Sequence, residues 1–577
     1  MTVYSSSRRA ARLFSLFLLA ACLGCLSPHA GAQADTDSDD AGHGRILLVL
    51  PFDNLALAAD AAPPSGSTAA ASLDWVREAA PEILNSRFAS SGFLPLTRED
   101  RLYALDHLGL PAGFQPSRAT ALRLAGTLDA NDILFGSFSI SGSGTSTTIA
   151  FHARIVDVAK LRLSEEITAS GELSQLIPLL NSLAWKLTRK LDPSFSVAEE
   201  TFRAADATLR IDAFEQFIRG LTENDSGEQL RHLKKATDLS PNFNEAWLAT
   251  GKIQFANQQY EQAAISFGKV SHPLNSSDPA ELEAGFYRGL SLLYSGGYAK
   301  AEESFAAVAR VLPLAEVLNN QAVAISRRGR DATALFRQAE AADPTDPDYH
   351  FNLAVSLHRH GDKTETLAEL AQYMKLRPGD SEAKAAEITW SSGAATDTTA
   401  TEPLERIKRT YNGAAFRQAA LMSDQVESAR LQALPAAERA QHLNRAAREK
   451  LDHGLLLEAE REYQAALAAD DHSAEAHAGV AQVRERSGDT AAARKEAMAA
   501  LDRGANADAY LVLARLDLAA NRLNEAHEEA AQAVRLSSPT DRAPRDLRKA
   551  IENRMDAAAG AKPATSPAAN APSQKPE

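Results

Sequence analysis

The chain of 577 residues is poor in cysteine, in aromatic residues and in long apolar runs. Its two cysteines, Cys22 and Cys25, both lie near the N-terminus, so the rest of the chain can form no internal disulfide and no cysteine-ligated metal site. Beyond the N-terminal segment no apolar run approaches the roughly 18 residues that a membrane-spanning helix needs. The body of the chain is therefore not expected to cross a membrane.

The chain also lacks an excess of positive charge. Lys and Arg together number 61 against 75 Asp and Glu, which gives a net charge of −14. General nucleic-acid binding needs a basic surface. We therefore expect protein or peptide partners and no nucleic acid.

Residues 1–34 have the features of a secretory signal. Three arginines precede the apolar run Leu13–Leu23. Cleavage after Ala34 would release a soluble product. The tetrapeptide Leu19–Cys22 resembles a bacterial lipobox, in which Cys22 would be lipid-modified and would anchor the protein. Both routes stay open, and both predict an exported protein that is either periplasmic or anchored to the outer membrane.

The strongest pattern present is a repeat. Ala459 and Ala493 are 34 residues apart, as are Gly454 and Gly488. A small residue is followed four positions later by an apolar one, and a helix-ending proline follows several of the units. The pairs are Ala263/Phe267, Ala301/Phe305, Ala332/Phe336 and Ala459/Tyr463, and the prolines are Pro241, Pro313, Pro344 and Pro378.

This period and pattern resemble the tetratricopeptide repeat (TPR), a helix–turn–helix unit that buries its apolar face by stacking on its neighbours. The sequence predicts one array over residues 210–380 and a second, with a capping helix, over 437–559. Phe267 and Phe305 are expected to lie between helices. Ala497 and Ala530 replace the usual aromatic residue, so the last two units should pack thinly. The predicted units are 211–243, 244–277, 282–315, 315–346, 347–380, 440–473, 474–506 and 507–540.

Residues 45–192 have a different pattern. Ile46–Leu50 is an apolar run typical of a buried strand, and apolar residues alternate along Ile149–Val156. The order of predicted elements is β-α-β-α-α-β-β-β-α. The fold class is therefore an α+β N-terminal domain followed by an all-α TPR solenoid of two arrays.

Three short stretches of this front domain carry a second resemblance: Val49–Asn54, Asp132–Ser137 and Ala153–Asp157. They resemble the TolB N-terminal type of domain, a fold that also occurs in CsgG-like envelope lipoproteins. The resemblance implies an envelope setting and contacts with other proteins, and it implies no catalytic group.

The other segments are predicted to connect these parts. Residues 35–44 are an acidic linker, 193–209 a second linker, 381–436 a linker with a connecting helix, and 560–577 a disordered tail. The connecting helix is predicted over Pro403–Ala433. Its apolar stripe would consist of Ile407, Tyr411, Phe416 and Leu421.

Four residues are candidates for a peptide groove. Asn320 and Asn352 occupy matching positions in adjacent repeats, as do Arg327 and Arg359. In the TPR family the first helix of each unit lines the concave groove. An asparagine amide can donate to and accept from a peptide backbone, and an arginine can pair with a carboxylate. The alternative is that Asn320 and Asn352 bond neighbouring helices.

The sequence shows no assembled catalytic, cofactor or metal motif. The favoured function is a non-enzymatic scaffold that binds protein or peptide partners. The alternative is an accessory or regulatory subunit of an envelope enzyme or signalling complex. If the front domain held a hydrolytic site, its candidate residues would be Asp53, His152, Arg154 and Asp157.

Overall fold

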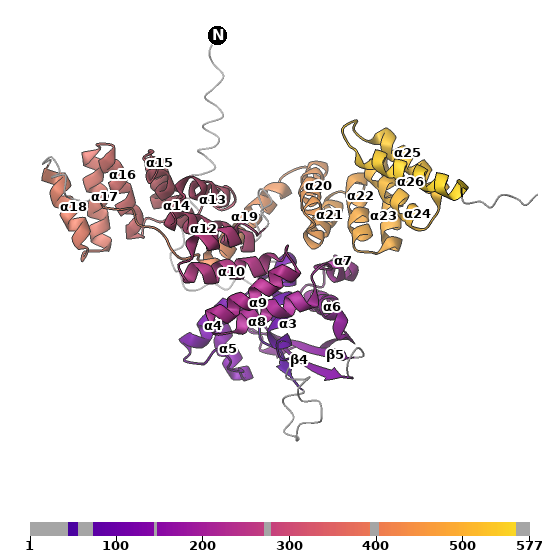
Figure 1. Ribbon diagram of the computed structural model, residues 1–577, viewed down its shortest axis with the longest axis horizontal. Helices are drawn as coiled ribbons and strands as arrows, with labels where there is room; N and C mark the ends of the chain where they lie inside the picture. The colour runs from indigo at the N-terminus through magenta and orange to yellow at the C-terminus, as the bar shows by residue number, and fades with distance from the viewer. Residues whose placement is uncertain (1–43, 56–72, 143–146, 271–278, 393–402, 561–577) are drawn as a thin grey trace, which may run out of the picture. The chain divides into compact units, whose positions relative to one another are not determined.

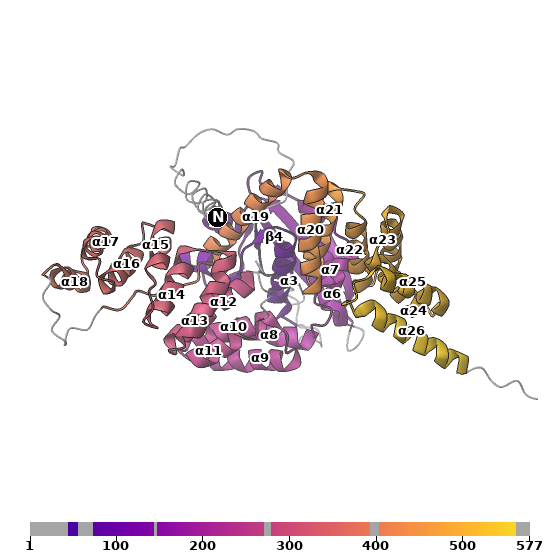
Figure 2. The same ribbon diagram turned by 90° about the horizontal axis from the view of Figure 1, so that it is seen from above.

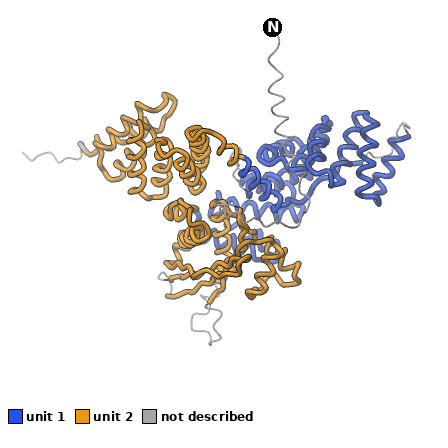
Figure 3. The backbone as a smooth tube through the Cα atoms, turned by 180° about the vertical axis from the view of Figure 1, so that it is seen from behind, with its two compact units in different colours: residues 1–40, 209–426 blue, residues 41–208, 427–577 orange. Residues whose placement is uncertain are grey.

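The computed structural model describes residues 44–55, 73–142, 147–270, 279–392 and 403–560. They divide into two compact units (Figure 3). Residues 209–426 belong to one unit, and residues 41–208 together with 427–577 belong to the other. The predicted signal with Cys22 and the C-terminal tail lie outside the described residues. No helix in the described part of the chain is long and apolar enough to cross a bilayer.

The front domain is built on one mixed sheet (Figure 1). The strand order is β3-β1-β4-β5-β6, with β2 paired to β4 and β7 paired to β5. Strands β3 and β2 run parallel to their partners β1 and β4, and β1 runs parallel to β4, whereas β4, β5, β6 and β7 pair in antiparallel fashion. The strands are β1 (Ile46–Val49), β2 (Asp53–Asn54), β3 (Leu94–Pro95), β4 (Asp132–Ser141), β5 (Thr148–Asp157), β6 (Arg162–Leu163) and β7 (Ile167–Glu172).

Helices cover the sheet. Leu48, Ile133 and Val156 pack with residues of α4 and α5 in one core cluster. The N-cap of α4 is Thr97, whose hydroxyl accepts a hydrogen bond from the amide of Asp100 in a capping box. The predicted α+β class is confirmed. The helices are α3 (Val76–Ser90), α4 (Arg98–His107), α5 (Arg118–Thr127) and α6 (Leu176–Leu191), with a 3₁₀ turn, η2, at Leu173–Gln175.

The segment predicted as a plain linker, 193–209, contains a short helix, α7 (Glu199–Ala204). Its Phe202 is fully buried. Thr201, also fully buried, donates to Glu460 of the second array. The linker prediction was wrong here because these tertiary partners are far away in sequence.

The first array is a run of helix pairs that follow one another in chain order (Figure 2). Phe267 and Phe305 are fully buried, as predicted. A Cβ on Gly251 or Gly289 would come within 2.6 Å of the ring of Phe267 or Phe305, so only glycine permits this close crossing. The helices are α8 (Ile211–Thr222), α9 (Ser226–Leu239), α10 (Asn244–Ala256), α11 (Tyr260–Phe267), α12 (Pro279–Tyr294), α13 (Tyr298–Val311), α14 (Ala315–Ser326), α15 (Thr333–Ala342), α16 (Pro347–Arg359), α17 (Lys363–Leu376) and α18 (Ser381–Ser392).

The second array repeats this plan with smaller core residues. Ala497 and Ala530 are fully buried where the first array has phenylalanines. After α19 (Gly413–Gln432), its helices are α20 (Ala436–Asp452), α21 (Leu456–Ala469), α22 (Ala474–Arg486), α23 (Thr490–Arg503), α24 (Ala507–Ala519), α25 (Leu523–Leu536) and the capping helix α26 (Ala543–Gly560).

The connecting helix begins later than predicted. Residues 403–412 form neither helix nor strand, and α19 begins at Gly413. The apolar spacing from Ile407 to Leu421 is therefore helical only in its second half. The first half has an irregular backbone because side chains of the first array bind it.

Candidate peptide groove

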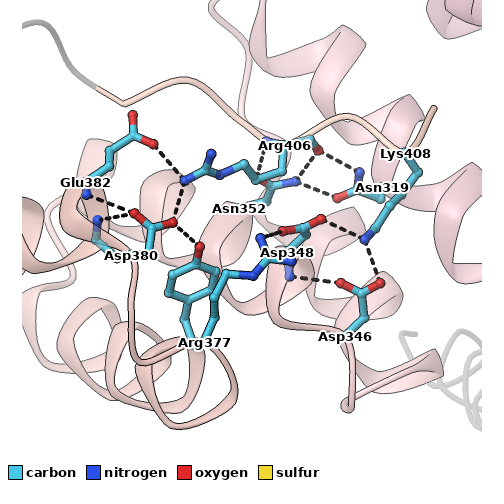
Figure 4. A network of polar contacts seen from close by, with 11 residues as sticks. Asn319, Asp346, Asp348, Asn352, Arg377, Asp380, Glu382, Arg406 and Lys408 are labelled. Atoms are coloured by element: carbon cyan, nitrogen blue, oxygen red, sulfur yellow. Dashed lines mark hydrogen bonds and ion pairs between the residues drawn. The ribbon is translucent and has the colours of Figure 1, made fainter.

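Residues 403–412, here called the groove segment, lie against the first helices of the repeats that contain α14 and α16 (Figure 4). In the repeat pattern the small residues of each first helix face its paired second helix. The opposite side of the first helix can therefore contact another segment. The groove segment contacts that side through both its backbone and its side chains.

Two asparagines bind the backbone of the groove segment. Asn352 accepts from the N–H of Arg406 at 2.6 Å and donates to its carbonyl at 2.7 Å. Asn320 does the same for Lys408, accepting at 2.9 Å and donating at 2.8 Å. Asn319 adds a bond to the carbonyl of Arg406 at 3.0 Å. Alternate residues of the segment are thus held by equivalent positions of successive repeats, and their buried polar groups are satisfied.

Asn352 also takes part in a contact between helices, whereas Asn320 bonds its neighbour Asn319 within α14. Asn352 donates to the side-chain oxygen of Asn319 at 2.7 Å, and Asn319 donates to that of Asn320 at 3.2 Å. All three are fully buried. The inter-helix bond of the alternative interpretation is therefore present for Asn352, and it belongs to the same network that directs the amides toward the peptide backbone.

Glu405 lies between two arginines. Its carboxylate is 2.8 Å from Nε of Arg327, forms an ion pair with Arg359 and accepts from the hydroxyl of Ser326 at 2.6 Å. Its side chain is fully buried. Burial alone would raise the pKa of Glu405, but the Ser326 hydrogen bond and the Arg359 charge outweigh burial and hold the pKa below its usual range. The groove therefore holds Glu405 as a carboxylate.

Arg406 points toward acidic residues at the start of α18. Its guanidinium bonds to Asp380 at 3.0 Å and to Glu382 at 2.6 Å (Figure 4). The guanidinium also lies over the ring of Phe351, with 4.4 Å to the centroid. Asp380 uses its other oxygen to accept from the backbone N–H groups at the start of α18. One carboxylate thus caps a helix and binds a cation.

Lys408 is held in the same way one repeat earlier. Its ammonium is 2.5 Å from Asp346 and 2.8 Å from Asp348, and it lies 4.9 Å from the ring centroid of Tyr349. Asp346 is the N-cap of α16 and bonds the amide of Asp348 with its other oxygen. Both the aromatic face and the two carboxylates attract the cation.

The C-terminal end of the groove segment is aromatic. The Tyr411 ring lies 5.7 Å from that of Phe286, 6.3 Å from that of Tyr287 and 4.1 Å from that of Phe416. Ile407 packs against the same buried cluster. The segment thus contacts α12, α14 and α16 of three successive repeats, and α18, which follows them.

All four residues singled out from the sequence meet this segment: Asn320 and Asn352 at its backbone, Arg327 and Arg359 at Glu405. Sequence analysis missed the occupant and the groups that bind its cations. Those groups, Asp346, Asp348, Asp380 and Glu382, resemble ordinary helix-start residues. The signal that could have found them was the acid–base–apolar–base order of residues 405–408.

The hydrolytic candidates of the front domain do not form one cluster in the described part of the chain. Asp53 accepts from Gln115 at 3.0 Å, whereas His152 and Arg154 both bond Glu166, at 3.1 and 3.3 Å. Each of these partners accounts for its candidate as a surface contact.

Three histidines of the two arrays have structural partners. His358 stacks on Trp390 with 4.3 Å between ring centroids, and His477 bonds Glu496 at 2.7 Å. His472 lies with Asp470 and Asp471 in the one group of three potential metal ligands that the described residues contain. His472 and Asp471 are exposed, and their hydrogen bond, 2.6 Å long, accounts for their closeness.

Comparisons with known proteins agree with the repeat architecture. The sequence profile of a tetratricopeptide repeat family matches residues 288–347 and 326–381, the region that contains α14 and α16. No curated protein gives a match to the chain.

Three solved structures illustrate the likeness. One is YrrB, described as a TPR protein with an unusual peptide-binding site; it is 16% identical, with 33% of this chain and all of that chain covered, at a TM-score of 0.28. MamA from Desulfovibrio magneticus RS-1 is 23% identical over 30% of this chain and 99% of its own, at a TM-score of 0.27. TTC0263, a thermophilic TPR protein in Thermus thermophilus, is 18% identical over 29% and 91%, at a TM-score of 0.23.

The matching profile covers α13 to α17 and includes the close crossing of Gly289 and Phe305. The chain therefore contains tetratricopeptide repeats, and the segment-filled groove lies within them.

Proposed function

We propose that this chain is an exported, non-enzymatic scaffold of the bacterial envelope that binds partner proteins through its TPR grooves and its front domain. One observation carries the proposal: the first array already holds an extended peptide, with asparagine amides on its backbone and charged groups on its side chains. A surface that binds a backbone in this way suits a linear segment of another protein.

The envelope setting rests on the sequence of residues 1–34 and on the resemblance of the front domain to the TolB N-terminal type. Mass spectrometry of the mature protein tests the setting directly. A mature chain that begins at a lipid-modified Cys22 supports a membrane anchor, and one that begins at Asp35 supports a soluble periplasmic form. A chain that retains Met1 contradicts export.

Groove-dependent binding is tested by crosslinking the full-length protein in its own cells and purifying it from the envelope. We expect specific proteins to be recovered with the wild type and to be lost with the Asn320→Ala, Asn352→Ala double variant. The matched control is Arg445→Ala, an exposed residue at the same repeat position of the second array. Equal recovery with all three forms would contradict a role for the groove.

A further inference from the structure

We propose that the groove segment stands in for a partner peptide, and that this peptide has a carboxylate followed by cations one and three residues later. The inference rests on the proposed scaffold function and adds the chemistry of the ligand. It also implies that the chain regulates its own groove, because a partner must displace residues 404–410 to bind.

The backbone contacts do not depend on whether the bound peptide belongs to this chain or to another protein. Asn352 and Asn320 bond the N–H and C=O of Arg406 and Lys408, groups that any peptide has. The two asparagines are 32 residues apart, whereas the groups they bind are two residues apart and run in the opposite direction. Each repeat therefore corresponds to two residues of the bound peptide. The peptide runs antiparallel to the order of the repeats.

The side-chain contacts define which peptide fits. Arg327 and Arg359 take a carboxylate, Asp380 and Glu382 take the next residue as a cation, and Asp346 and Asp348 take a cation two residues further on. A reversed peptide, or one with exchanged charges, would place like charges together. The groove thus selects both charge order and direction.

The groove segment is suited to be a stand-in because side chains of the array hold it. Its backbone bonds at Arg406 and Lys408 go to asparagine side chains, not to a sheet or a helix ladder. Leu404, Arg409 and Thr410 are exposed on either side of the buried contacts. Displacement of the segment would therefore leave the helices of the array intact.

Tethering makes the wild-type chain a poor binder. A segment on a short linker competes at an effective concentration in the millimolar range, and only the fraction of molecules with an open groove can bind a peptide in trans. The same contacts then serve as specificity elements when a partner binds and as a block when none does.

The test is a binding titration with a fluorescent peptide of the sequence Pro403–Asn412 and three forms of the full-length protein. The opened form carries Arg406→Glu and Lys408→Glu, so that Asp380, Glu382, Asp346 and Asp348 repel its own segment. The control form carries the same charge change outside the groove, Arg430→Glu and Arg445→Glu. The third form is the wild type.

We expect the opened form to bind the peptide about 10–100-fold more tightly than the wild type and the control form, because its groove is free. A peptide with Arg406→Glu and Lys408→Glu should bind the opened form at least about 10-fold more weakly than the natural sequence. Adding Asn320→Ala and Asn352→Ala to the opened form should abolish binding of the natural peptide.

An opened form that keeps the wild-type circular dichroism spectrum but does not bind the peptide overturns the inference. If the opened form loses its helical signal, a Gly-Ser replacement of residues 404–408 of equal length takes its place in the same titration. A wild-type dimer that the peptide dissociates would assign the groove to a second copy of the chain, and this outcome too overturns a foreign partner.

The two proposals can fail separately. Loss of partner recovery with the Asn320→Ala, Asn352→Ala variant in cells supports groove binding even if the pure protein ignores this peptide, which would mean that the ligand has another charge order. Peptide binding by the opened form without any groove-dependent partner in cells would instead contradict the scaffold function and leave the groove as an internal clasp.

Discussion

The two arrays share one repeat plan but present different groups at matching positions. Asn352 lies 14 residues before Thr366, the small residue of its second helix, and Asn320 lies 12 before Ala332 because its turn is shorter. At 14 residues before Ala459, Ala493 and Ala526, the second array has Arg445, Gly479 and Val512. The second array therefore has no equivalent of Asn320 and Asn352 at these positions.

The second array instead holds α7, which lies in the segment that follows the front domain. Glu460 is fully buried; it accepts from the amide of Ala198 at 3.0 Å and from the hydroxyl of Thr201, and it pairs with Arg484 at 2.6 Å. The corresponding residue of the first array, Glu302, pairs with Arg328 at the surface. One array thus binds an extended segment through its first helices, and the other binds α7 through a second helix.

Other repeated features are the same in both arrays and so have a structural role. His350 bonds Glu369 at 2.7 Å in the first array, and His477 bonds Glu496 at 2.7 Å in the second. Both pairs join the two helices of one unit and are 19 residues apart. The comparison separates groups that build the repeat from groups that give each array its partner.

The largest expected effect concerns the phenylalanine core of the first array, where the last two units of the second array have alanines. Phe305→Ala should lower the free energy of unfolding by about 3–5 kcal/mol, because it empties a fully buried site. Ile265→Ala, an exposed position of the same array, should change it by less than about 0.5 kcal/mol. Urea unfolding followed by circular dichroism measures both, and equal values would show that the aromatic ring does not hold the helices together.

The next effect tests the joint of the second array. Glu460→Ala should cost about 3 kcal/mol, because it leaves Arg484 and two donors of α7 without their buried acceptor. Glu302→Ala, its counterpart in the first array, should cost less than about 1 kcal/mol because its ion pairs are exposed. Thermal unfolding of the two variants would refute the contrast if both lost the same stability.

A smaller effect is expected when asparagine is placed at the matching first-helix positions of the second array. A Cβ on Gly479 would lie 2.2 Å from the ring of Tyr463. Gly479→Asn should therefore destabilise the protein by about 1–3 kcal/mol through overpacking. Arg445→Asn, at an exposed position, should stay within about 0.5 kcal/mol of the wild type. If Gly479→Asn has the same free energy of unfolding as the wild type in urea titrations, packing does not exclude asparagine at this position. The first helices of the two arrays then differ there only in sequence.

The smallest effect is a pH dependence of the groove segment. The pKa of Glu405 is lowered from its ordinary value of 4.5, so its carboxylate stabilises the docked segment above pH 4.5, and this contribution is lost as the pH falls through the lower folded pKa. Hydrogen exchange of the amides of Arg406 and Lys408 should therefore speed up in that acid range. Glu405→Gln should remove this step, and a step that persists in the variant must come from other carboxylates.

Much of the fold could be predicted from the sequence because helix periodicity is a local property. The pairs Ala263/Phe267 and Ala301/Phe305 predicted that Phe267 and Phe305 lie between helices, and matching positions in the repeats singled out Asn320 and Asn352. The state of residues 403–412 could not be predicted in this way. Ile407, Tyr411 and Phe416 are spaced as on a helix, and the amides that compete for this backbone are more than 50 residues away.

The acidic half of the groove was missed for a related reason. Asp346 and Asp380 both cap helices, and their sequence context is fully explained by that role. A carboxylate has two oxygens, however, and the second oxygen of each binds a cation of the groove segment. Which distant cation it meets depends on the stacking of the repeats and not on the neighbouring residues.

The position of the groove segment after its binding residues has a consequence for the time course of synthesis. Asn320, Asn352 and the acidic residues up to Glu382 all precede Glu405 in the chain. During translation the receiving face is thus made before its own occupant emerges. A partner that is present before the groove segment is synthesised finds the groove empty, whereas a partner that arrives later must displace the segment. The fraction of the protein that binds a partner therefore depends on when the partner arrives.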